Sequence, residues 1–78
     1  FKGRISGFSQ KGMYVKLENG VEGVIYFNNL KDDYYIYDEE HYSLIGREFG
    51  KKYMMGEEIN IKVIGVSKLK REVEFCII

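Results

Sequence analysis

The 78-residue chain has little of what disulfides, metal sites and catalytic centres require. It contains one cysteine, Cys76, and one histidine, His41, so neither an internal disulfide nor a zinc site of clustered Cys and His is predicted. A lone thiol favours a reducing compartment, and we expect the protein in the cytoplasm. Glycine-rich phosphate-binding motifs are absent. We expect no catalytic residue in this chain.

Long hydrophobic runs are also missing. There is no stretch of about 18 apolar residues and no charged-then-apolar leader, so the sequence predicts neither a membrane span nor a secretion signal. A chain of this length buries one small core and leaves no room for a large catalytic cleft beside it. We expect residues 1–78 to form a single, monomeric domain. Because the sequence does not begin with Met, we also expect this domain to be cut from a longer protein.

One cluster of metal-ligand residue types is present, at residues 38–41, but it does not predict a metal site. Asp38, Glu39, Glu40 and His41 are consecutive, so their side chains point in different directions, and no spaced partner completes a coordination shell. Acid–base catalysis would need a more buried setting for these carboxylates. We expect a solvated acidic loop, with no metal and no cofactor.

Net charge is zero, but it is unevenly distributed along the chain. Residues 1–30 and residues 59–78 each carry four basic and two acidic side chains. Residues 31–58 carry four basic and eight acidic side chains. The two ends are therefore basic and the middle is acidic. A neutral molecule of this kind can still present a basic face to a polyanion.

Period-2 alternation of apolar residues predicts strands at both ends of the chain. The expected strands are Lys2–Ser9, Met13–Glu18, Val21–Phe27, Ile59–Ser67 and Arg71–Ile77. Ile64 and Val66 make the fourth strand apolar on both faces, as in a crowded barrel strand. Glycines inside these strands (Gly3, Gly7, Gly12 and Gly23) predict bulges and sharp coiling. The fold class is all-β, a five-stranded antiparallel barrel of the oligonucleotide-binding (OB) type.

The connection over residues 28–58 is too long for a hairpin loop, so we expect structure within it. Asn28, Asn29 and Leu30 resemble a single helical turn with Asn as a cap. A short strand pair or a helical turn is expected further along. Five apolar side chains are expected to pack against the barrel: Leu44, Ile45, Phe49, Tyr53 and Met54.

The segment Gly12–Phe27 is predicted to form a hairpin with aromatic and basic side chains on its outer face. Asn19-Gly20 predicts a type I′ turn. Met13, Val15 and Leu17 fall on one face, which leaves Tyr14, Lys16 and Tyr26 to share the other. Two tyrosines beside a lysine suit single-stranded nucleic acid, because rings stack on bases and ammonium groups bind phosphate. The alternative is that tyrosine is simply a good strand former.

In an OB barrel the second and third strands and the adjoining loops form the ligand face, so further basic and aromatic residues join the hairpin there. Phe8 is a candidate third ring, although a buried role for it is equally consistent with the sequence. The candidate nucleic-acid-binding residues are Phe8, Lys11, Tyr14, Lys16, Tyr26, Lys68, Lys70 and Arg71.

Five segments together resemble the S1 RNA-binding domain: Gly3–Ile5, Gly12–Val15, Glu22–Asn28, Gly56–Val63 and Arg71–Phe75. The segments Leu30–Glu39, Leu44–Gly46 and Tyr53–Glu57 are similar to the S1 domain of the ribonuclease R and ribonuclease II group. The resemblance implies an accessory domain that binds single-stranded RNA and guides it to a magnesium-dependent 3′-to-5′ exoribonuclease site in another domain.

The same resemblance assigns family binding positions to Tyr14 and Arg71. It also marks departures: Lys11 stands where an aromatic residue is common, Tyr26 where histidine is common, and Ser67 where aspartate often occurs. It therefore implies an RNA surface that relies less on bases and more on phosphates.

Two alternatives remain open from the sequence. The chain is either an S1 domain of another RNA-metabolism or translation protein, or a docking module for neighbouring domains of its parent. In the second case the acidic, tyrosine-rich connection over residues 31–58 would make the contact.

Overall fold

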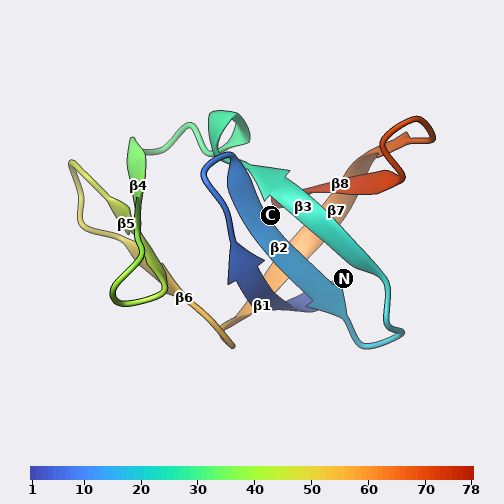
Figure 1. Ribbon diagram of the computed structural model, residues 1–78, viewed down its shortest axis with the longest axis horizontal. Coiled ribbons are helices and arrows are strands. Elements are labelled where there is room, and N and C mark those ends of the chain that lie inside the picture. The colour runs from blue at the N-terminus through green and yellow to red at the C-terminus, as the bar shows by residue number, and fades with distance from the viewer.

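Eight strands and one short 3-10 turn make up the computed structural model, which describes residues 1–78 (Figure 1). Five strands close a barrel in the order β1-β2-β3-β8-β7. These are β1 (Lys2–Phe8), β2 (Gly12–Leu17), β3 (Glu22–Tyr26), β7 (Glu58–Ser67) and β8 (Glu72–Ile77). The predicted barrel is confirmed, and each strand end lies within one residue of its expected position. No helix has the length and apolar character needed to cross a membrane.

The barrel departs from the antiparallel prediction at one seam. β3 and β8 pair in parallel, with Val24 opposite Glu74, whereas the other barrel pairs are antiparallel. The register of β1 shifts between Ile5 and Gly7, and that of β7 shifts between Val63 and Gly65. Bulges of this kind add the coiling that closes a small barrel.

Alternation places one side of each barrel strand in a common core. Its fully buried members include Ile5, Met13, Val15, Ile25, Ile61 and Phe75. Gly23 lies directly under the ring of Phe75, where a Cβ atom would collide with that ring. This glycine therefore serves close packing rather than the predicted bulge, and the same holds for Gly3 beneath Val15.

The expectation that β7 is buried on both faces is wrong. Ile64 is half exposed and Val66 is 69% exposed. Past the bulge, β7 and β8 run on as a hairpin beyond the barrel, so this part of β7 has no layer above it (Figure 1).

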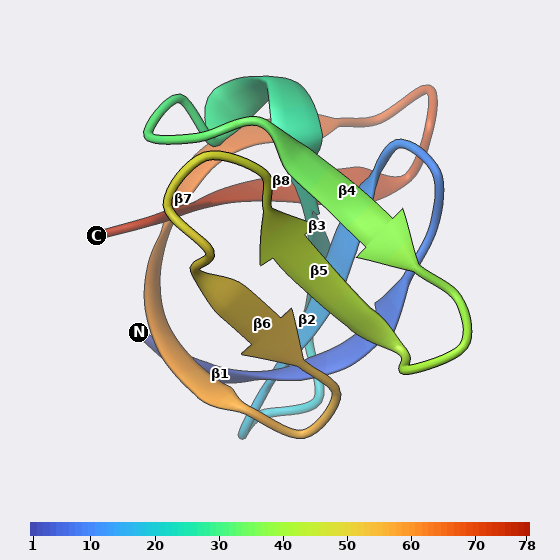
Figure 2. The same cartoon turned by 90° about the vertical axis from the view of Figure 1, so that its left-hand side faces the viewer.

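The connection between β3 and β7 forms a three-stranded sheet rather than a strand pair, made of β4 (Tyr35–Asp38), β5 (Ser43–Gly46) and β6 (Lys52–Met54). This sheet lies across one end of the barrel (Figure 2). Leu44 and Tyr53 are buried in the common core, as predicted. Phe49 and Met54, which were expected to pack against the barrel, are instead 74% and 46% exposed. Phe49 falls in the turn after β5, and Met54 points from β6 to the outer side.

Two local predictions need correction. The 3-10 turn η1 spans Phe27–Asn29, one residue earlier than expected, and has no side-chain cap. The β2–β3 turn is a three-residue loop over residues 18–20, in which Gly20 alone has a positive φ, at 88°. Such loops combine a type I turn with a left-handed residue, so Asn19 does not adopt the type I′ conformation. The Asn19 side chain accepts a hydrogen bond from the Val21 N–H at 3.1 Å instead.

Candidate nucleic-acid interface

Tyr14 and Tyr26 lie on the outer face of the β2–β3 hairpin, as the alternation predicts. Tyr14 pairs across the strands with Val24, and Tyr26 pairs with Gly12. Val24 is 1% exposed although it points to this outer face, so it forms an apolar floor between the two half-buried rings. The hairpin therefore presents two rings on one continuous surface.

Two neighbouring hollows run beside these rings. Tyr14 and Arg71 line the first, together with Val24 and Glu72. Tyr26 and Lys70 line the second, which Glu72 and Glu74 also border. Each tyrosine therefore has a basic side chain from the β7–β8 turn beside the same hollow. Rings and cations in this arrangement can hold bases and phosphates of one strand.

Glu72 lies between the two hollows and contacts two of the candidate residues. The Tyr26 hydroxyl donates a hydrogen bond to Oε2 of Glu72, and Lys11 Nζ lies 3.8 Å from its Oε1. Lys11 Nζ also lies 6.0 Å from the centre of the Tyr26 ring. The bond to Glu72, with burial and the charges of Glu72 and Glu74, raises the pKa of Tyr26 to about 12. Tyr26 therefore stays neutral near pH 7.

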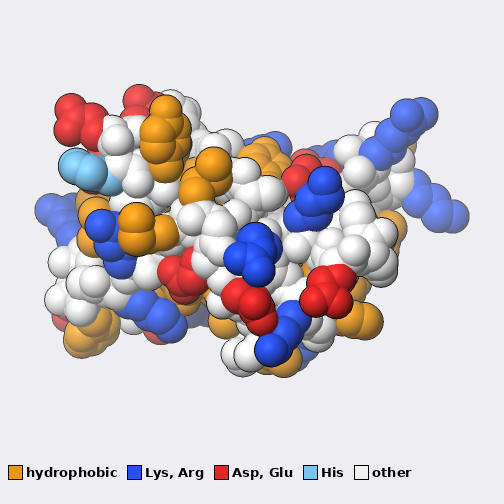
Figure 3. Space-filling view, turned by 90° about the horizontal axis from the view of Figure 1, so that it is seen from below, with side chains coloured by type: hydrophobic (Ala, Val, Ile, Leu, Met, Phe, Trp, Pro, Cys, Tyr) orange, Lys and Arg blue, Asp and Glu red, His pale blue; other side chains and the backbone are white.

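The β7–β8 turn carries three exposed cations. Lys68, Lys70 and Arg71 take part in none of the ion pairs of the structure. Arg71 adopts a left-handed φ of 53°, which ends the turn before β8 begins. Basic side chains project from this end of the molecule, whereas basic and acidic side chains alternate over the rest of the face shown in Figure 3.

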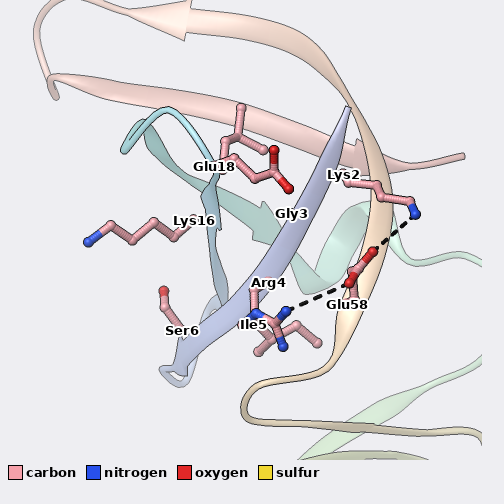
Figure 4. Close-up of a pocket in the computed structure, with 9 residues that line it drawn as sticks. Lys2, Gly3, Arg4, Ile5, Ser6, Lys16, Glu18 and Glu58 are labelled. Carbon is pink, nitrogen blue, oxygen red and sulfur yellow. Dashed lines mark ion pairs between the residues drawn. The ribbon is translucent and has the colours of Figure 1, made fainter.

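Lys16 belongs to a different hollow from the tyrosines, although it shares their side of the sheet. That hollow is lined by β1 and the start of β7, including Lys2, Arg4 and Glu58. Glu58 pairs with Lys2 at 3.2 Å and with Arg4 at 3.7 Å, while Lys16 extends away from them (Figure 4). Lys16 is thus an exposed cation at the margin of the tyrosine surface.

Phe8 is half-buried and stacks on Tyr37 of β4, with ring centres 5.4 Å apart and an interplanar angle of 27°. Both rings also pack against the common core. The structure therefore gives Phe8 a role in joining the barrel to the small sheet, and it lies outside both tyrosine hollows.

The acidic residues of β8 are the part of the surface that sequence reasoning missed. Alternation places Glu72 and Glu74 outward, but it does not predict their partners. Asn29 donates a hydrogen bond to Oε2 of Glu74 at 2.6 Å across 45 residues of sequence, and Tyr26 reaches Glu72 across 46. Both contacts depend on the parallel β3–β8 seam, for which a single sequence carries no signal.

Glu39, Glu40 and His41 form an exposed turn between β4 and β5, as expected for a solvated loop, whereas aspartates elsewhere in the connection are hydrogen-bonded. Asp33 accepts hydrogen bonds from the backbone N–H groups of Tyr34, Glu48 and Phe49. Asp38 lies 2.7 Å from Nδ1 of His41, and that contact holds the pKa of Asp38 below its ordinary value. The structure brings no three metal-ligating side chains into one group. These aspartates therefore stabilise turns.

A closed barrel of this strand order, with half-buried rings on the outer face of its second and third strands, defines an oligonucleotide-binding domain. The chain belongs to the S1 RNA-binding domain family, whose model matches residues 1–78.

Among curated proteins, the chain is 38% identical over 79 residues to ribonuclease R of Aquifex aeolicus, covering all of this chain and 11% of that protein. It is 37% identical over 75 residues to ribonuclease R of Ureaplasma parvum, covering 96% of this chain and 10% of that protein. The chain thus spans about a tenth of the length of these relatives.

Solved structures give the same relationship. The apo form of Mycoplasma genitalium RNase R superimposes with a TM-score of 0.94 at 25% identity, covering all of this chain and 12% of that one. The same values hold for that protein in complex with ribose-methylated single-stranded RNA. The fold of the chain is therefore that of a domain within RNase R.

Proposed function

We propose that this chain is a single-stranded RNA-binding accessory domain of a ribonuclease R-like 3′-to-5′ exoribonuclease. The observation that carries the proposal is the pairing of ring and cation in two adjacent hollows. Each hollow offers a ring on which a base can stack and a cation that can bind a phosphate. The pairs are Tyr14 with Arg71 and Tyr26 with Lys70. The RNA-bound RNase R of matching fold supports the same ligand class.

The domain binds RNA by stacking and by charge, without selecting a fixed sequence. Stacking of a base on an aromatic ring is worth about 1–3 kcal/mol, and every base has a face that stacks. Two rings and a few cations give a modest, salt-sensitive affinity. Such a domain holds RNA near an enzyme and lets it slide, which suits a role in guiding substrate.

Catalysis belongs to the parent protein outside residues 1–78. We infer that the parent is a cytoplasmic, magnesium-dependent hydrolase, that the domain is monomeric, and that it adjoins the other domains of one chain. The similarity to ribonuclease R sequences and the small share of their length that this chain covers support this inference. Acidic catalytic motifs in the parent sequence would support it further, whereas a series of S1-like repeats would favour a translation protein.

Titration of a fluorescein-labelled oligouridine of about ten nucleotides tests RNA binding directly. We expect binding at low salt, and Tyr14→Ala should weaken it by at least about fivefold, the lower end of the value of one stacked base. Tyr34→Ala is the matched control, because Tyr34 is an exposed tyrosine of the connection that lines neither of the two hollows. Absence of wild-type binding at low salt, or equal effects of the two substitutions, would refute the proposal.

The small sheet favours a second role in docking to a neighbouring domain of the parent. Its outer side exposes Ile36, Met54 and the adjoining Phe49. Glu39 and Glu40 are exposed, and their side chains make no hydrogen bond or ion pair, unlike Asp32, Asp33 and Asp38. Glu39→Gln with Glu40→Gln therefore tests charge without disturbing turns. Docking predicts weaker association with the rest of the parent and unchanged or stronger RNA binding; unchanged association would exclude a contribution from these charges.

A further inference from the structure

We propose that Glu72 competes with RNA phosphate for Lys11, so that the free domain keeps one of its RNA-binding cations occupied by its own carboxylate. The inference rests on the proposed RNA-binding function and deepens it. It assigns to Glu72 the role of limiting affinity for a polyanion.

Glu72 lies on β8 and is held in place by two side chains from the β2–β3 hairpin side of the surface, Lys11 and Tyr26. Lys11 immediately precedes β2 and Tyr26 ends β3, while Glu72 opens β8. One carboxylate oxygen faces Lys11 Nζ at 3.8 Å, and the other accepts the hydroxyl of Tyr26. The Glu72 side chain is only 25% exposed, compared with 59% for Lys11. The carboxylate is therefore a positioned charge, and Lys11 is its more exposed partner.

The position of this charge matters because Glu72 borders both hollows. A phosphate that follows a base stacked on Tyr26 approaches a carboxylate before it meets Lys11. Lys70 and Arg71 line the same hollows without an ion-pair partner. Of the cations beside these two hollows, Lys70 and Arg71 are therefore free, whereas Lys11 is occupied by Glu72.

An ion pair 3.8 Å long with an exposed lysine is weak, so phosphate can displace Glu72 from Lys11 rather than being excluded. The displaced carboxylate nevertheless stays nearby, since Tyr26 still holds it. Two like charges near contact distance in water change an equilibrium constant by about fivefold. Glu72 therefore lowers affinity moderately and favours rapid release of RNA.

A purely structural role for Glu72, as an acceptor that orients Tyr26, makes a different prediction. Gln at this position keeps the shape of the side chain and an oxygen acceptor for the Tyr26 hydroxyl, but it removes the charge. If Glu72 only orients Tyr26, Glu72→Gln leaves RNA affinity unchanged. If it competes for Lys11, affinity rises.

The first experiment compares Glu72→Gln with Glu58→Gln in the 78-residue chain, using a fluorescein-labelled oligouridine of about ten nucleotides. We expect Glu72→Gln to bind the RNA about fivefold tighter at low salt. The slope of log K against the logarithm of salt concentration should become steeper by about 0.7, the value of one added phosphate contact on a single strand. Glu58→Gln changes net charge equally and frees Lys2 and Arg4 in the other hollow. It should stay within about twofold of wild type. Equal gains for both variants would overturn the proposal, because they would indicate a general charge effect.

Lys11→Ala supplies the second test, which does not depend on folding of the Glu72 variant. In the wild-type background it should cost less affinity than Lys70→Ala does, because phosphate must first displace Glu72 from Lys11. Combined with Glu72→Gln, it should abolish the gain. A loss for Lys11→Ala as large as that for Lys70→Ala would overturn the proposal, as would a gain that persists without Lys11. If the wild-type chain binds no RNA at low salt, the proposed function itself fails instead.

Discussion

Gly23 on β3 lies against the edge of the Phe75 ring on β8, so that the parallel seam of the barrel closes around a position without a side chain. A methyl group here would meet the ring and the Val73 carbonyl at once. Because Phe75 is fully buried, the ring has little room to move.

Gly23→Ala should therefore destabilise the domain by about 1–3 kcal/mol, the usual cost of overpacking a core. Urea unfolding followed by circular dichroism measures it. Gly65→Ala is the matched control, since Gly65 also lies in a barrel strand but a Cβ there would only touch Glu74 at 4.0 Å. A Gly23 variant as stable as the Gly65 variant would contradict the packing argument.

Asp33 should make the small sheet sensitive to acid. Burial alone would raise the pKa of this carboxyl, but the backbone N–H groups of Phe49, Glu48 and Tyr34 outweigh burial and hold its pKa below the ordinary value. A lowered pKa in the folded state means that Asp33 stabilises the fold above about pH 4, and that this contribution is lost as the pH falls through the folded-state value.

Asp33→Ala is expected to lower the urea midpoint at pH 7 and to flatten the loss of stability between about pH 5 and pH 2. Glu40→Gln serves as control, because the Glu40 side chain makes no hydrogen bond or ion pair. Identical acid profiles for wild type and Asp33→Ala would exclude this role.

Tyr26 should ionise only at high pH, with a pKa of about 12. Absorbance of tyrosinate during alkaline titration reports it. Tyr26→Phe should remove a high-pH component, and Glu72→Gln should move that component to lower pH, because the charge and the acceptor that favour the neutral phenol are weakened. Since the folded-state pKa is raised, the associated stability is present below about pH 10 and is lost as pH rises through about 12. A titration curve unchanged by Glu72→Gln would contradict the hydrogen bond.

Lys70 should contribute to RNA binding through charge alone. Lys70→Ala is expected to weaken oligouridine binding by about threefold to fivefold at low salt and to reduce the salt slope by about 0.7, as loss of one phosphate contact requires. Lys52→Ala is the control, because Lys52 is an exposed lysine on the small sheet. A Lys70 effect that persists unchanged between about 50 mM and 200 mM salt would indicate a role other than phosphate binding.

The barrel strands were predictable because each has a period of two that burial enforces. Met13, Val15 and Leu17 alternate with Tyr14 and Lys16, and the observed burial follows that alternation. The small sheet was less predictable, since β4, β5 and β6 are three or four residues long and too short for a clear period. The apolar residues Leu44 and Tyr53 predicted that this segment packs against the barrel, but they did not predict how its strands pair.

The candidate site was predictable in its residue types and only partly in its geometry. The β2–β3 register places Tyr14 and Tyr26 together because a tight turn joins the two strands. Lys70 and Arg71 reach the same surface because β8 is the next barrel neighbour of β3. Phe8 instead stacks on Tyr37, a partner contributed by a sheet that the sequence did not define.

By itself the sequence determined the five barrel strands and the outward rings of the hairpin, because alternation acts over a few residues. Its motif segments also determined the membership in an RNA-binding family. Only the tertiary structure decided which charges remain free. Glu72 meets Tyr26 across 46 residues and lies 3.8 Å from Lys11, because closure of the barrel pairs β8 with β3. Side-chain pairing across that seam depends on three-dimensional register, which no short-range pattern encodes.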